Sequence, residues 1–223
     1  MQFLTKLFKI VVGIFLLPVC VGAVLTLWEV ISKSGKAESI WITVLSGAVV
    51  WVLIYIFLPK PIWIYVFGHE LTHAIWSWIF GGHLKKMKVS SDGGHVLITK
   101  SNFLTSLAPY FFPIYVVFLV VIFAVGSIFW NWNQYVLLFY FLIGVMYAFH
   151  ITLTSHVLKT EQSDIKNEGY IFGGVIIFLG NMLVLLIGIP LLTKMNMQNA
   201  LNLWLNNSMQ VYNYISLHLS LYL

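Results

Sequence analysis

The motif His69-Glu70-Leu71-Thr72-His73 is the part of this chain whose residue types and spacing could do chemistry. Side chains four positions apart lie on one face of a helix, so His69 and His73 can direct two imidazoles at a single ion. Glu70 can then reach a water bound to that ion. Zinc accepts nitrogen ligands, lowers the pKa of its water to about 7 and leaves a glutamate to pass the proton to a leaving amine. The motif therefore indicates a zinc site suited to peptide hydrolysis.

Chance is the alternative explanation of this motif. The chain has few His, Asp and Glu residues, and a random His-Glu-x-x-His should appear in only about one such sequence in several hundred. Glu70 also lies inside an apolar stretch, where an uncompensated carboxylate is costly. Both observations favour a metal role for the motif.

A catalytic zinc normally has three protein ligands, so one more must come from elsewhere in the chain. Asp164 is one candidate, because Ser163 before it could cap a helix and aim a first-turn carboxylate at the ion. His150 lies within an apolar stretch, where a polar residue is costly, but a hydrogen bond to a neighbouring helix explains it equally well. The remaining candidates are His156 and four residues that are more typical of solvated loops: Glu161, Glu168, His83 and His95.

The elements that must position these residues are hydrophobic helices. The sequence is 60% hydrophobic and 9% charged, whereas soluble domains have about a quarter charged residues. A helix needs about 20 apolar residues to cross a bilayer. Stretches of this kind lie near 10–31, 40–58, 62–81, 103–128, 135–157 and 170–192. We therefore expect an all-α polytopic membrane protein with about six transmembrane helices and the lipid bilayer as a partner.

Other segments interrupt or extend these helices. Apolar residues alternate on both sides of Ser91-Asp92-Gly93-Gly94, which predicts a small membrane-associated β-hairpin over 84–100. Pro109 and Pro113 should kink or interrupt the helix at 103–128. The tail over 193–223 is amphipathic and uncharged after Lys194. An interfacial helix and packing against the other helices are both expected for it.

The net charge of +5 comes from twelve lysines and no arginine. This charge indicates membrane topology. It does not indicate a nucleic-acid partner, because the sequence has no basic run interleaved with aromatic residues. The loops after the first, third and fifth expected helices are richer in lysine than the connections on the opposite side of the membrane. The positive-inside rule therefore places these loops in the cytoplasm, together with the end of the helix that carries the motif. The lysines of these loops are Lys33, Lys36, Lys85, Lys86, Lys88, Lys100, Lys159 and Lys166, against Lys6, Lys9, Lys60 and Lys194.

The chain resembles the site-2 protease family of intramembrane zinc metalloproteases, as a minimal and divergent member, over about 62–192. The resemblance rests on Gly68-His69-Glu70-Leu71-Thr72-His73-Ala74, Gly93-Gly94-His95-Val96, Leu107-Ala108-Pro109 and the aspartate that begins a later helix. Two departures are visible. Gln162-Ser163-Asp164-Ile165 stands where the family usually has an Asp-Gly pair, and Ala108-Pro109 where it usually has Gly-Pro.

The resemblance implies an intramembrane zinc metalloendopeptidase that hydrolyses peptide bonds in or near transmembrane segments. His69, His73 and Asp164 would bind zinc, and Glu70 would activate the zinc-bound water as general base. The hairpin resembles the family's β-loop, which implies that Gly94, Val96 and Ile98 meet the substrate as an added strand.

The chain then divides into N-terminal transmembrane helices at 1–60, a metalloprotease core at 61–192 and an amphipathic C-terminal tail at 193–223. We expect it in a bacterial cell membrane as a multi-pass protein, with the active-site end facing the cytoplasm. No feature of the sequence indicates an oligomeric state.

Two other functions remain open from the residues alone. A transporter of zinc or another divalent metal can also place His-Glu-x-x-His on a transmembrane helix, although it should have a second metal-binding helix and a His-rich loop, neither of which is visible. A catalytically silent relative that binds membrane segments is the third interpretation. The intact His69, Glu70 and His73 disfavour it.

Overall fold

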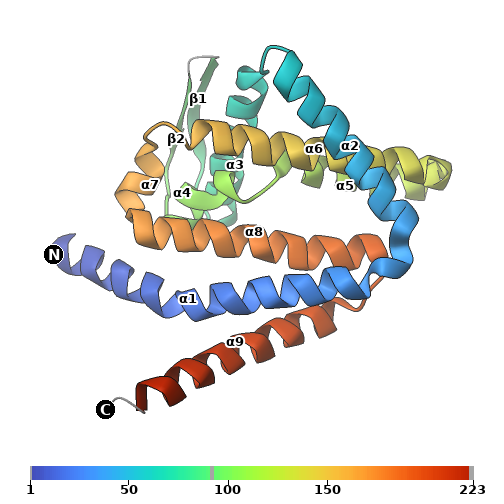
Figure 1. Cartoon of the computed structure of the whole chain (residues 1–223). Coiled ribbons are helices and arrows are strands. Elements are labelled where there is room, and N and C mark those ends of the chain that lie inside the picture. The colour runs from blue at the N-terminus through green and yellow to red at the C-terminus, as the bar shows by residue number, and fades with distance from the viewer. Residues whose placement is uncertain (1, 91–92, 221–223) are drawn as a thin grey trace. The chain divides into compact units, whose positions relative to one another are not determined.

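The structure is a computed structural model that describes residues 2–90 and 93–220. Helices make up most of it, and a two-stranded antiparallel sheet is present beside them (Figure 1). This confirms the expected all-α class with a small hairpin. In chain order the helices and strands are α1 (Gln2–Lys33), α2 (Glu38–Phe57), α3 (Ile62–Ile79), β1 (Leu84–Ser90), β2 (Gly93–Ile98), α4 (Phe103–Leu107), α5 (Ile114–Trp130), α6 (Val136–Val157), α7 (Ser163–Glu168), α8 (Tyr170–Thr193) and α9 (Met197–Ser220).

These elements group into two compact units. The first comprises Met1–Ala37 and Ser163–Leu223, and the second comprises Glu38–Gln162. These units are defined by which residues pack together. The three segments expected from the sequence are defined instead by the function expected of each. That division stays a prediction.

In the first unit, α1 lies between α8 and α9 (Figure 1). Polar groups join α9 to α1, since the Asn207 side chain donates to Thr26 Oγ1 at 3.0 Å and to Glu29 Oε1 at 3.1 Å. The two helices approach closely at Gly22, where an added Cβ would lie 2.4 Å from Ser208 Oγ. The tail helix is thus packed along α1, as one of its two sequence interpretations expects.

In the second unit, α2 crosses α6 at two glycines. A Cβ on Gly47 would lie 2.0 Å from the Phe141 carbonyl oxygen, and one on Gly144 would lie 1.9 Å from that of Val44. Only residues without a Cβ let two helix backbones approach so closely, as is common between membrane helices. Beside this crossing, a hydrophobic core joins α2, α3 and α6: Trp51, Tyr65, Val66, Phe149 and Leu153.

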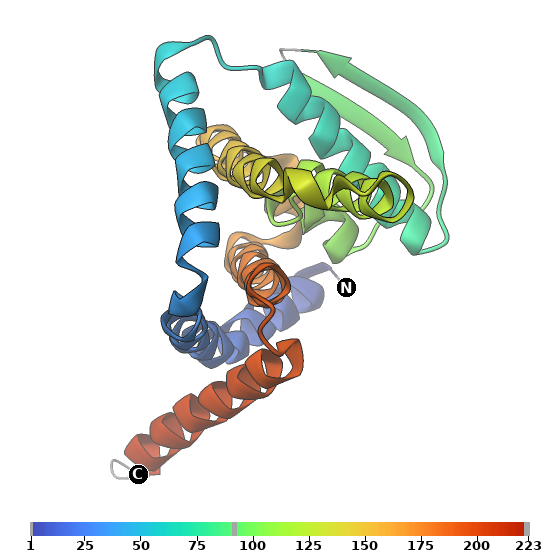
Figure 2. The same ribbon diagram turned by 90° about the vertical axis from the view of Figure 1, so that its right-hand side faces the viewer.

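The hairpin lies along α3 in the same unit (Figure 2). Its register pairs Ser90 with Gly93, Val89 with Gly94 and Met87 with Val96. Val89 packs against the hydrophobic core, so one face of the hairpin is fixed to the helix that carries the motif. The predicted hairpin is confirmed, while Ser91 and Asp92 of its turn lie outside the described residues.

The helix expected over 103–128 is interrupted. It consists of α4, a 3-10 turn (Ala108–Tyr110) and α5, and the two parts meet at an angle of 81°. Proline has no N–H to donate within a helix and clashes with the preceding turn. The break therefore falls where Pro109 and Pro113 predict it.

Four helices of the described chain are long and apolar enough to cross a membrane: Leu4–Lys33, Glu38–Phe57, Trp132–Val157 and Tyr170–Thr193. The bent pair at 103–130 gives a fifth if it counts as one span. The helix α3 is not among them, because it carries His69, Glu70 and His73 within 18 residues. The count of six spans therefore stays a prediction.

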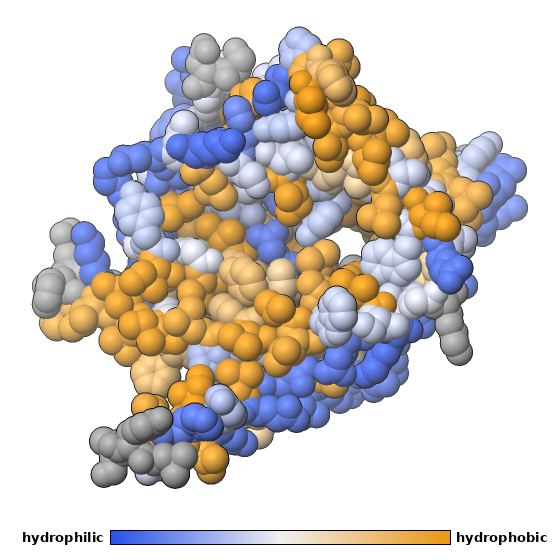
Figure 3. Space-filling view, viewed as in Figure 1, coloured by the Kyte–Doolittle hydropathy of each residue, from blue (hydrophilic) through white to orange (hydrophobic). Residues whose placement is uncertain are grey.

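The outer surfaces of these helices are apolar. Figure 3 shows hydrophobic residues gathered over α1 and α8 on the face that it draws. Large side chains such as Phe8, Phe15 and Trp28 are exposed on α1. Exposed apolar surface of this extent is unusual for a protein in water and is compatible with a membrane protein.

Candidate metal centre

The motif lies in the middle of α3 with its two imidazoles side by side. The ring centroids of His69 and His73 are 4.9 Å apart, as expected for positions one helical turn apart. His73 and Glu70 are buried, with 7% and 8% of their surfaces exposed. The sequence prediction that His69 and His73 share one face of a helix is therefore confirmed.

A backbone carbonyl holds His73 in place. The Nδ1 atom of His73 lies 2.8 Å from the carbonyl oxygen of Thr105 in α4. A carbonyl oxygen can only accept, so in the neutral imidazole Nδ1 carries the hydrogen and Nε2 keeps its lone pair. Histidine ligands of metals characteristically donate their second ring N–H in this way, which fixes the tautomer and the ring orientation. His73 is thus prepared to bind a metal through Nε2.

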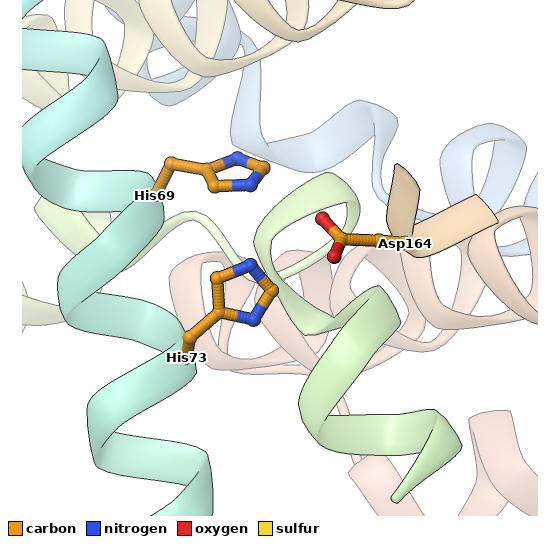
Figure 4. Close-up of side chains that lie close together, drawn as sticks. All are labelled: His69, His73 and Asp164. Carbon is orange, nitrogen blue, oxygen red and sulfur yellow. The ribbon is translucent and has the colours of Figure 1, made fainter. Parts of the chain in front are cut away.

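Asp164 completes a group that could hold a metal ion. One ligand atom from each of His69, His73 and Asp164 lies within 4.8 Å of the others, and Figure 4 shows the carboxylate directed toward the two imidazoles. Asp164 is in the first turn of the six-residue α7. Just before this helix, Gln162 donates to the Val157 carbonyl at 3.0 Å, within the turn that follows α6.

The donor set fits zinc. Two imidazoles and one carboxylate are a ligand set of catalytic zinc, which keeps a further position open. The His73 tautomer protonated at Nδ1 agrees with metal binding, because it leaves Nε2 available as a ligand atom. The metal's identity is an inference from these donors, because other divalent ions also bind imidazole and carboxylate.

The other candidates for a third ligand among the described residues are not part of this group. Glu168 forms an ion pair with Lys9, so its carboxylate already has a cationic partner. His83 and His95 are exposed, the first just before β1 and the second within β2. Glu161 and His150 are not members of the group that contains Asp164.

The hairpin meets the motif at Gly94. A Cβ added to Gly94 would lie 2.6 Å from Cγ and from Oε1 of Glu70, and 2.6 Å from Val66 Cγ1. The backbone of β2 therefore passes directly beside the Glu70 carboxylate, at a position that remains exposed. Val96 and Ile98 follow at alternate positions and are half-buried.

A small cavity opens beside the motif within the second unit. It has room for about one water molecule, and its lining includes His69, Thr72, Tyr65, Tyr115 and His150. Of four polar residues near the motif, Thr72 is in this lining, and its hydroxyl donates to the Gly68 carbonyl at 2.7 Å. The other three make hydrogen bonds elsewhere: Ser77 to the Lys100 carbonyl, Asn102 to the Thr105 N–H and Ser106 to Ser101.

Sequence reasoning did not find two contributors to this site. The Thr105 carbonyl is a backbone group and leaves no signature of its own, although Asn102 is a typical N-cap and marks the start of α4. Tyr110 packs its ring edge-on to His69, with centroids 5.1 Å apart. It follows Pro109 in the turn that interrupts the helix.

The fold and the site define a largely helical protein, with helices apolar enough to cross a membrane and a His-His-Asp group that could bind a metal ion. Comparisons with protein-family models, with curated proteins and with solved structures found no match.

Proposed function

We propose that the chain is an intramembrane zinc metalloendopeptidase that hydrolyses peptide bonds in or near transmembrane segments, as its resemblance to site-2 proteases implies. The observation that carries the proposal is the arrangement of the motif residues of α3 and Asp164. Two imidazoles and the Asp164 carboxylate converge within 4.8 Å, and Glu70, buried beside them, is the group that a hydrolase needs as general base.

Each residue has a defined task in this proposal. His69, His73 and Asp164 hold the ion. Zinc bound there would supply a Lewis acid that lowers the pKa of water to about 7 and polarises a carbonyl group. Glu70 accepts the proton of the attacking water and delivers it to the nitrogen of the leaving amine.

The hairpin supplies a place for the substrate. A transmembrane helix uses its own amides in its hydrogen-bond ladder, so it must unwind locally before a peptide bond can be cleaved. An extended segment can pair with an exposed strand edge through main-chain hydrogen bonds. The position of Gly94 beside Glu70 supports β2 as that strand, with Val96 and Ile98 continuing it away from the base.

The same proposal includes the membrane. A multi-pass protein in a bacterial cell membrane accounts for the apolar helices, and the lysine-rich connections favour a cytoplasmic active-site end. The substrate would then be a transmembrane protein or peptide that reaches the site from within the bilayer.

One experiment separates the proposed activity from the two alternatives. The protein is purified in detergent, its zinc content is measured, and wild type and Glu70→Gln are compared for cleavage of a panel of tagged transmembrane peptides. Zinc retained by both with cleavage only by wild type supports the peptidase. Zinc flux into liposomes without cleavage would instead indicate a carrier, and metal binding with neither activity a silent relative.

A further inference from the structure

His150 is a buried polar residue that the proposed mechanism does not use. It lies in α6, only 7% of its surface is exposed, and its Nε2 atom has no hydrogen-bond partner among the described residues. A buried ring nitrogen without a partner costs free energy, and an apolar side chain of similar size would avoid that cost. A buried polar group left in this state requires an explanation, such as a bound water or ligand.

The cavity beside the motif explains how a buried His150 could bind a ligand. His150 and the metal-ligand candidate His69 line the same cavity, together with Tyr65, Tyr115 and Phe149. The two tyrosines already donate their hydroxyl hydrogens, Tyr65 to Thr154 Oγ1 and Tyr115 to the Ile64 carbonyl. The imidazole of His150 is therefore a group in this lining that can still bind a small polar ligand.

We propose that His150 is a catalytic residue whose Nε2–H donates a hydrogen bond to the carbonyl oxygen of the scissile peptide. The inference rests on the proposed function, because the oxygen must be that of a substrate held at the His-His-Asp group. In the neutral imidazole one ring nitrogen carries the hydrogen, and the tautomer protonated at Nε2 is the one that can donate into the cavity.

The bond would strengthen during the reaction. Water adds its oxygen to the carbonyl carbon, the C=O π pair moves onto the carbonyl oxygen, and Glu70 takes the proton of the water. Collapse of this adduct breaks the C–N bond while Glu70 returns the proton to the amine nitrogen. His150 gives up no proton and stabilises the negative charge on oxygen, which is the kind of interaction that accelerates acyl transfer most.

Two other roles fit His150 less well. As a metal ligand it should belong to the group around His69, yet that group contains Asp164 instead. As a structural residue it should hydrogen-bond to a neighbouring helix, as Thr152 of the same helix does with Trp51. His150 has no such bond among the described residues.

The test uses the zinc-loaded, full-length protein with two probes: the transmembrane peptides and a phosphinic Leu-Leu pseudopeptide, whose tetrahedral phosphinate imitates the adduct. We expect His150→Phe to keep its zinc and its KM, to lose kcat by about 10²–10³, and to bind the phosphinate at least about tenfold more weakly. His150→Gln, whose amide can still donate, should recover part of both losses. His156→Phe is the matched control, since His156 is on the same helix but packs on Tyr55 outside the cavity.

Each contrary outcome has a distinct meaning. Phosphinate binding and kcat equal to wild type in both folded His150 variants would overturn the inference. Loss of zinc from His150→Phe would make His150 a ligand and overturn it as well. If the wild-type protein neither cleaves the peptides nor binds the phosphinate, the proposed function itself fails and the inference fails with it.

Discussion

Replacing Gly94 by alanine should displace Glu70, the proposed general base, while leaving metal binding unchanged. The new Cβ would lie 2.6 Å from Cγ and Oε1 of Glu70 and from Val66 Cγ1, whereas carbon atoms pack at about 3.5–4.0 Å. Either the β2 backbone or one of these side chains must therefore move by about 1 Å. Glu70 can move most readily because its side chain is flexible, and no positive φ is recorded for Gly94, so alanine adds no backbone strain.

A misplacement of about 1 Å can reduce catalysis by about 10²-fold. We therefore expect Gly94→Ala to lose roughly this factor in kcat and to bind zinc like wild type, because the ligands are untouched. The cost in stability should stay at or below about 1–3 kcal/mol, the usual range for adding a methyl group to a packed site.

The assay compares initial cleavage rates of one transmembrane peptide with zinc content measured on the same samples. Gly188→Ala is the matched control, since its added Cβ would have no atom within 4 Å apart from its chain neighbours and the backbone of its own helix. A Gly94→Ala protein that cleaves at the wild-type rate would refute the placement of β2 beside a catalytic Glu70.

Three further predictions test the ligands and the strand. Asp164→Asn should reduce bound zinc after dialysis because a carboxylate ligand is lost, whereas Glu161→Gln should keep it; the reverse result would reassign the third ligand. Asn102→Ala removes the side chain that caps α4 through the Thr105 N–H at 2.9 Å, which should cost about 1 kcal/mol in thermal unfolding. The same change should weaken zinc retention against a chelator, since α4 carries the carbonyl that orients His73, and unchanged retention would argue against that coupling. Proline at Val96 and Ile98 removes two backbone donors of β2, so cleavage should fall with zinc unchanged, and normal cleavage would exclude β2 as the substrate strand.

Local spacing predicted the parts of the site that depend on one element. His69 and His73 share a helix face because any two positions one turn apart do so, and the break near Pro109 follows from the chemistry of proline. The hairpin followed from alternation around a glycine-rich turn. None of these features requires knowledge of how distant segments pack.

The remaining features depend on packing between segments that are far apart in the sequence. The contact of Gly94 with Glu70 and the bond from His73 to the Thr105 carbonyl join groups 24 and 32 positions apart. Every residue has a backbone carbonyl, so the sequence does not indicate that the one of Thr105 contacts His73. For His150 the sequence indicated only that a polar residue in an apolar helix is costly, and the cavity was needed to propose a ligand for it.

The central claim is that Glu70 drives hydrolysis at the His-His-Asp group, and a zinc-matched comparison in lipid vesicles tests it most directly. Wild type and Glu70→Gln, loaded to equal zinc content, are given the same transmembrane peptide in ¹⁸O-water, and the products are analysed by mass spectrometry. Wild type should release a fragment whose new carboxyl group carries the label, and Glu70→Gln should be slower by at least about 10²-fold. Equal rates in the two proteins, or no labelled product from wild type, would contradict the account.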